Sequence, residues 1–224
     1  EHPVIGMELT ADGQFIALEH EYLFISEGRV RNRGKWGFGV PTCICSDPQG
    51  RIWAAIRMGS GQWKVGEVHR DGTLASHWQF NEAITALSWH PQRAQLFALA
   101  TESGTVFRLD ASSQVRRFAT LPKGSGLLSG LAVDEQGNVW TALSDGWSIV
   151  KFDCDGNIEQ MLGVPVASPT DLCFGGSAGT TLYITSSRQA VSRQALKTAP
   201  WSGTVMCTPV DSRGAPATIT RGPV

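Results

Sequence analysis

The sequence predicts an all-β fold, specifically a β-propeller of five four-stranded blades. Three observations support this prediction: a segment of about fourteen residues recurs five times, the copies alternate apolar with polar residues, and a turn rich in Gly, Asp or Asn interrupts four of the five copies. A repeat of this kind indicates small antiparallel sheets, none of which buries much apolar surface alone. When such sheets are arranged as blades around a channel, each one buries its apolar faces against its neighbours.

The repeat is clearest in SGLAVDEQGNVWTA (Ser129–Ala142), which aligns with TCICSDPQGRIWAA (Thr42–Ala55). The five copies begin 37 to 44 residues apart, a usual length for one blade. Their first residues are Ile5, Thr42, Thr85, Ser129 and Thr170.

Each copy continues with a third apolar run, and most continue with a fourth, as in GTVFRLDASS followed by SQVRRFAT. Period-two alternation between D-G, Q-G and S-G turns is typical of hairpins. A short helix is expected within Gln189–Lys197. A β-sandwich is the alternative fold, but a sandwich does not require a sequence repeat, so the repeat favours the propeller. The repeat runs from end to end, so residues 1–224 are predicted to form one domain.

Composition restricts the partners. The 19 Lys and Arg residues against 20 Asp and Glu leave a formal charge of −1, which carries no footprint for nucleic acid. The basic run Arg29–Lys35 is interpreted as a solvated blade edge, where like charges deter strand pairing. No apolar run is long enough to span a membrane, and no signal peptide opens the sequence.

Five cysteines, an odd number without C-x-x-C spacing, indicate structural thiols in a reducing compartment, and the protein is expected to be cytoplasmic. The oligomeric state is left open.

The repeat also predicts where a site lies. In a propeller the innermost strands line the channel, so the first residues of the copies should form a ring at one mouth. Loops between the second and third strands should rim the same mouth. Candidate ligand contacts from the ring and the rim are Thr42, Cys43, Thr85, Ser129, Thr170, Asp171, Arg57, Glu102, Asp145 and Trp201.

The segment Thr170–Met206 contains C-F-G-G, an apolar run ending in T-S-S-R, an insertion of about fifteen residues and then G-T-V-M. In these features the last blade resembles the gluconolactonase, senescence marker protein and luciferin-regenerating enzyme family. SGLAVDEQGNVWTALSDGWSIVKFD resembles the preceding blade. The resemblance implies a six-bladed propeller, so a six-bladed ring whose first blade is missing from this chain is the alternative architecture.

The same resemblance implies one divalent cation, held by a Glu, an Asn and an Asp. Here Thr85 occupies the Asn position and Ser129 the Asp position, while Thr42 and Cys43 stand where the family has an Asn-Asp pair. The Glu has no counterpart, because Ile5 aligns with the family's second blade. Neutral hydroxyls replace carboxylates poorly around a hard cation, so we expect no metal and no other cofactor.

Two classes of function follow, with a protein-interaction platform as a third. The first is a metal-independent enzyme acting on a carbonyl or lactone compound, with Glu19 or His20 exchanging protons and Arg188 orienting the ligand. The insertion Thr185–Ser202 should bring Arg188 and Trp201 toward Glu19, His20 and Glu21 at the mouth. The second is a silent module that binds a small ligand at the same place.

Overall fold

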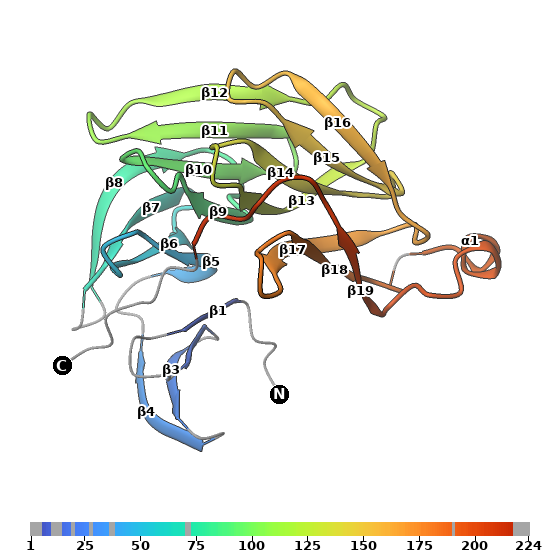
Figure 1. Cartoon of the computed structure of the whole chain (residues 1–224). Coiled ribbons are helices and arrows are strands. Elements are labelled where there is room, and N and C mark those ends of the chain that lie inside the picture. The colour runs from blue at the N-terminus through green and yellow to red at the C-terminus, as the bar shows by residue number, and fades with distance from the viewer. Residues whose placement is uncertain are drawn as a thin grey trace.

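The structure, a computed structural model, is an array of antiparallel sheets that follow one another along the chain (Figure 1). It describes residues 39–69, 73–189 and 191–216 in full, together with the backbone of the strands at 6–9, 15–18, 21–26 and 29–35. In that part of the chain, no helix has the length and hydropathy needed to cross a bilayer.

Each sheet is a meander in which neighbouring strands in sequence pair. The first contains β1 (Gly6–Leu9), β2 (Phe15–Leu18), β3 (Glu21–Ser26) and β4 (Arg29–Lys35). The second contains β5 (Val40–Ser46), β6 (Ile52–Arg57), β7 (Trp63–Val68) and β8 (Leu74–Phe80). The third contains β9 (Ala86–Trp89), β10 (Gln95–Ala100), β11 (Thr105–Asp110) and β12 (Val115–Thr120).

The fourth sheet contains β13 (Leu127–Val133), β14 (Val139–Ser144), β15 (Ser148–Phe152) and β16 (Ile158–Gly163). The last contains β17 (Pro169–Gly175), β18 (Thr181–Ser186) and β19 (Val205–Pro209). The short helix α1 (Arg193–Thr198) lies in the long loop between β18 and β19 and stands off from the sheets in Figure 1.

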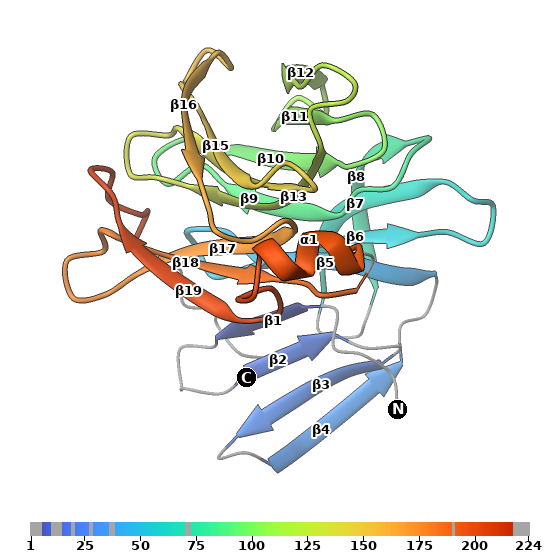
Figure 2. The same ribbon diagram turned by 90° about the vertical axis from the view of Figure 1, so that its right-hand side faces the viewer.

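The first strands of the sheets lie inside the array. Contacts link β1 to β5, β5 to β9, β9 to β13 and β13 to β17, whereas the later strands of each sheet extend outward (Figures 1 and 2). This is the arrangement of propeller blades, so the predicted class is confirmed. The number of blades in the ring stays a prediction. The basic strand β4 lies at the edge of its sheet, as expected.

The core lies between the sheets. Trp53 packs toward the third sheet, Phe97 toward the fourth and Trp140 toward the last, and the three side chains are buried. These residues occupy equivalent places in the second strands of their sheets, so one aromatic position of the repeat closes three successive interfaces. The interpretation of Trp53 and Trp140 as packing residues is confirmed.

The observed strands differ from the predicted pattern in the last sheet. The last sheet has three strands among the described residues rather than four. After β19 the chain leaves that sheet and crosses to the turn that follows β13. There Gly214 bridges to Asp134, the Glu135 amide donates to the Arg213 carbonyl over 2.8 Å and the Ala215 amide donates to the Val133 carbonyl over 3.3 Å. The Gly214 amide donates back to the Gly179 carbonyl over 2.9 Å, in the turn between β17 and β18. This segment therefore links the fourth sheet to the last and adds no strand to the last sheet.

Candidate functional site

Four of the five predicted ring residues, Thr42, Thr85, Ser129 and Thr170, lie near one end of the inner strands, where hydroxyl groups connect neighbouring sheets. Thr42 Oγ1 donates to the Ile84 carbonyl over 2.6 Å, from the second sheet to the residue before Thr85. Ser129 Oγ donates to the Thr170 carbonyl over 2.7 Å, from the fourth sheet to the last. These bonds show that the ring residues of neighbouring copies lie together, as the repeat predicts.

The third sheet continues this series. Thr85 Oγ1 lies 2.7 Å from Thr101 Oγ1, and Thr101 Oγ1 donates to the Leu128 carbonyl over 2.8 Å. In the last sheet, Thr170 Oγ1 lies 2.9 Å from Thr185 Oγ1. Because a hydroxyl has a single hydrogen to donate, Thr42 and Ser129 face a ligand chiefly as acceptors. Ile5, the first member of the predicted ring, lies outside the described residues.

Asp171 is the acidic group of this ring. Its Oδ1 accepts a hydrogen bond from the Leu172 amide over 2.8 Å, and its side chain rests on Gly130 of the neighbouring sheet. A Cβ atom on Gly130 would lie 2.3 Å from Asp171 Oδ1 and 2.6 Å from Asp171 Cα. Gly130 also has a φ of 67°, which L residues rarely adopt. The missing side chain at Gly130 therefore makes the space that Asp171 occupies.

The environment of Asp171 favours its protonated form. Asp171 is exposed near one end of its strand, but the neighbouring protein partly desolvates its carboxyl and raises its pKa above the usual value, while hydrogen bonds from the Leu172 and Leu131 amides offset part of the rise. A carboxyl group with a raised pKa is suited to accept and return a proton near neutral pH.

Cys43 lies near Asp171 but is not a reactive thiol. Burial raises the pKa of Cys43 to about 12, and the charge of Asp171 adds a smaller contribution in the same direction. Its Sγ lies 3.8 Å from the Ile84 carbonyl. The thiolate is the nucleophilic form of cysteine, so this side chain serves as a packing group of the ring.

The rim residues are more exposed. Arg57 lies over the Trp63 ring with its Cζ 5.7 Å from the ring centroid. Glu102 and Asp145 are exposed in the loops that follow β10 and β14. Asp145 has a φ of 60°, as expected in a tight turn. These three side chains are free to contact a ligand above the ring.

The insertion provides two more of the predicted residues. The aliphatic part of Arg188 crosses Gly203, where a Cβ atom would lie 2.6 Å from Arg188 Cγ, and this contact joins the two ends of the insertion. Trp201 is 60% exposed. Glu19 and His20 lie outside the described residues, as does the side chain of Glu21. The predicted approach of the insertion to these residues stays a prediction.

The donor set at the ring does not fit the divalent cation that the resemblance implies. Thr85 and Ser129 stand at two ligand positions, and their hydroxyl groups are engaged with neighbouring residues. Among the described residues, no group of three or more His, Cys, Asp or Glu side chains has the spacing of a metal site. A hard cation needs more anionic oxygen than Asp171 alone supplies.

The sequence analysis did not predict an Asp–Trp pair that recurs at the opposite end of the inner strands, in the second and fourth sheets. Asp47, Asp134 and their tryptophans form equivalent buried hydrogen bonds there: Trp53 Nε1 donates to Asp47 Oδ2 over 3.1 Å, and Trp140 Nε1 donates to Asp134 Oδ2 over 3.2 Å. The sequence contains the pattern that could have predicted these bonds, since each Asp stands six residues before its Trp in the aligned copies.

The structure is thus a β-propeller that carries hydroxyl groups at one end of its inner strands. Comparison with known proteins confirms the predicted resemblance: residues 84–188 match the family described as the SMP-30/Gluconolactonase/LRE-like region. A solved structure of a luciferin-regenerating enzyme superposes with a TM-score of 0.82 at 19% identity, over 99% of this chain and 82% of that chain, which shows a shared fold.

Two curated relatives carry lactonase names. The chain is 33% identical over 183 residues to the 6-deoxy-6-sulfogluconolactonase of Pseudomonas putida, covering 75% of this chain and 61% of the relative. It is 26% identical over 199 residues to the pentonolactonase XacC of Haloferax volcanii, covering 81% of this chain and 66% of the relative. The chain thus spans roughly three fifths to two thirds of the length of these relatives.

Proposed function

We propose that this propeller hydrolyses a lactone or a related carbonyl compound at the channel mouth. The match of residues 84–188 to the family and the similarity to two lactonases support the reaction class. The observation that carries the proposal for this chain is the Asp171 carboxyl, which Leu172 and Gly130 hold in a fixed position inside the hydroxyl ring.

In the proposed reaction Asp171 acts as the general base. Its carboxylate accepts a proton from water as the water oxygen bonds to the lactone carbonyl carbon. The ring C–O bond then breaks, and the departing oxygen takes the proton back from Asp171, so that one water is consumed and one hydroxy acid is formed. A base whose pKa is raised toward the working pH can perform both transfers.

The other predicted residues have supporting roles in this proposal. Arg188 orients the ligand through its carbonyl or carboxylate oxygen, since a guanidinium offers paired donors. Glu19 or His20 shares the proton exchange from the rim. We propose that the reaction is metal-independent, because hydroxyl groups at the Thr85 and Ser129 positions supply no charge to a cation.

Turnover of a panel of sugar lactones in the presence of a chelator tests this proposal. We expect hydrolysis to persist in chelator and to fall by about a hundredfold or more in Asp171→Asn, the usual contribution of a general base. Asp155→Asn, the same change in an exposed turn, serves as the matched control. Activity that disappears in chelator and returns with calcium would contradict metal independence, and full activity in Asp171→Asn would exclude Asp171 as the base.

The alternative function is a small-ligand-binding propeller without turnover. It is favoured by one observation, the use of the Thr42 and Ser129 hydroxyl hydrogens between sheets, which gives these residues a structural role. Binding of a lactone without hydrolysis, at equal affinity in Asp171→Asn and in the original protein, would favour this alternative.

We also propose that the protein works in the cytoplasm. The five cysteines are free thiols, with Cys43 and Cys45 buried and Cys154, Cys173 and Cys207 exposed. Three exposed thiols suit a reducing compartment. A small molecule at the mouth is the partner that we propose, with no role for nucleic acid or a membrane.

A further inference from the structure

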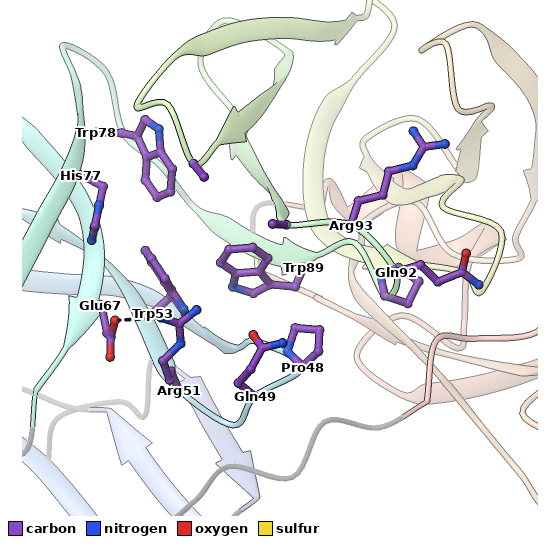
Figure 3. A pocket seen from close by; sticks show the side chains of 13 residues that line it. Pro48, Gln49, Arg51, Trp53, Glu67, His77, Trp78, Trp89, Gln92 and Arg93 are labelled. Carbon is purple, nitrogen blue, oxygen red and sulfur yellow. Dashed lines mark hydrogen bonds and ion pairs between the residues drawn. The ribbon is translucent and has the colours of Figure 1, made fainter.

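A second pocket lies between the second and third sheets, at the end of β5 and β9 away from the mouth. It has a volume of about 330 Å³, within the usual range for small-molecule sites. Figure 3 shows three tryptophans around it, with Arg51 beside Trp53 and with Arg93 on the far side of Trp89. The pocket is independent of the proposed lactone hydrolysis.

The aromatic walls are held rigidly against one another. The Trp53 ring centroid lies 5.7 Å from that of Trp78 and 5.1 Å from that of Trp89. The His77 ring packs at a tilt against Trp53 and Trp78, with centroid distances of 5.3 and 5.4 Å. Trp53 and Trp78 are each only 4% exposed. Aromatic faces fixed in this way suit a flat ring, which can stack without ordering flexible side chains.

Two hydrogen-bond donors of these walls have no partner. Trp53 Nε1 is satisfied by Asp47, but the buried Nε1 atoms of Trp78 and Trp89 find no acceptor among the described residues. Buried donors are nearly always paired in folded proteins, and these two belong to residues that line the pocket. A ligand that carries oxygen or nitrogen acceptors would satisfy these groups.

The charges of the lining point to an anion. The charged residues of the lining are Arg51, Arg93 and Glu67. Asp47 lies against Arg51, so the charge of Arg51 is balanced and Arg93 supplies the remaining positive charge. Glu67 already accepts from Arg51 Nη1 over 3.4 Å, and Arg51 Nε is bonded to Asp47 over 2.6 Å. Arg93 makes no ion pair with a described residue and raises the positive potential of the pocket. The lining therefore offers N–H donors and a positive charge but no free carboxylate.

We propose that this pocket binds a small aromatic carboxylate. The flat ring of the ligand packs against the indole surface where Trp53, Trp78 and Trp89 line the pocket, and its carboxylate accepts from Arg93 and from an indole N–H. The pocket is a second ligand site on the propeller, on the face opposite the hydroxyl ring.

Calorimetric titration with 2-naphthoate tests the proposal, with 2-naphthylmethanol as a neutral probe of the same shape and tetramethylammonium as a cationic probe. We expect one site for naphthoate and at least tenfold weaker binding of the alcohol, because a hydrogen bond to a charged group is stronger than one to a neutral group. Naphthoate should bind equally well to Asp171→Asn, since the mouth is at the other end of the strands.

Two variants locate the site. Arg93→Gln removes the charge, and Trp89→Phe removes the indole N–H but keeps an aromatic face; each should weaken naphthoate binding by about tenfold. Arg116→Gln, on the outer strand β12, is the matched control and should bind normally. Equal affinity for the alcohol, stronger binding of tetramethylammonium, or normal binding in both Arg93→Gln and Trp89→Phe would overturn the proposal.

Discussion

One aspartate motif determines much of the local structure. In each of four turns an Asp carboxylate accepts hydrogen bonds from the amides two and four residues further along the chain. These residues are Asp47, Asp110, Asp134 and Asp153. Three of these turns have the sequence D-x-x-G, and Asp110 is followed by Ala-Ser-Ser instead. The repeat predicted turns at these places, because Asp side chains stabilise them locally. It did not predict the bonds to Trp53 and Trp140, which depend on how the next strand is placed.

Asp134→Ala is expected to lower the free energy of unfolding by about 3 kcal/mol, because it leaves several buried donors unpaired. Asp134 is fully buried and accepts from the amides of Gln136 and Asn138, from Asn138 Nδ2 and from Trp140 Nε1. Urea unfolding measures the change. Asp153→Ala removes the same turn bonds at a more exposed position, where water replaces them, and should cost much less. Equal losses in the two variants would contradict this account.

His90 occupies the place of these aspartates in the third sheet and should make stability depend on pH. Burial lowers the pKa of His90 below 6.5, with a further lowering by Arg93 and a partly compensating rise from Asp134. The unfolded chain therefore binds a proton more readily than the folded protein does, so the free energy of unfolding should fall as the pH decreases below about 6.5.

Urea unfolding between pH 5 and pH 7.5 checks this prediction. His90→Asn should show a smaller loss of stability on acidification than the original protein. The His90 Nδ1 atom accepts from the Gln92 amide over 3.1 Å, a bond that the asparagine Oδ1 can imitate. The idea fails if the two proteins lose stability in parallel over this range.

At the scale of elements, the repeat predicted the strands well because the pattern of alternation is local. Thr42–Ala55 contains most of β5, the following turn and the start of β6, and the expected short helix within Gln189–Lys197 is observed as Arg193–Thr198. The aromatic pocket was not predicted. It joins residues from β6, β8 and β9, and no spacing in the sequence reveals which indoles lack a hydrogen-bond partner.

Gly130 connects strand geometry to the candidate site. It lies at an irregularity in the pairing of β13 with β14, between Ser129 and Ala132. Gly130→Ala should lower the free energy of unfolding by about 2 kcal/mol, through its positive φ and the clash with Asp171. It should also reduce lactone turnover, because Asp171 is displaced.

Thermal unfolding and initial rates measure the two effects of Gly130→Ala. Gly163→Ala is the matched control, since a Cβ atom there would contact nothing within 4 Å. A Gly130→Ala protein with the original activity would show that the position of Asp171 is unimportant for turnover.

At the scale of the whole molecule, comparison of equivalent repeat positions shows that one face of the last sheet is exposed. Tyr183 aligns with Trp53, Phe97 and Trp140, the residues that face the following sheet. Those three are 4%, 2% and 1% exposed, whereas Tyr183 is 38% exposed. On the same face, Val205 is 67% exposed. A five-bladed ring that closes on itself would cover this face with the first sheet, whereas the six-bladed alternative leaves room for another sheet at this position.

Oxidation by hydroxyl radicals, followed by mass spectrometry of the peptides, distinguishes these two architectures. We expect Tyr183 to be oxidised several times faster than Trp140, although an indole is intrinsically the more reactive ring, because Trp140 is covered by the last sheet and Tyr183 faces solvent. The ratio should be the same over a range of protein concentrations if the chain is monomeric. Protection of Tyr183 at every concentration would mean that the first sheet closes the ring as a fifth blade. Protection that increases with concentration would mean that the uncovered face is buried between two copies.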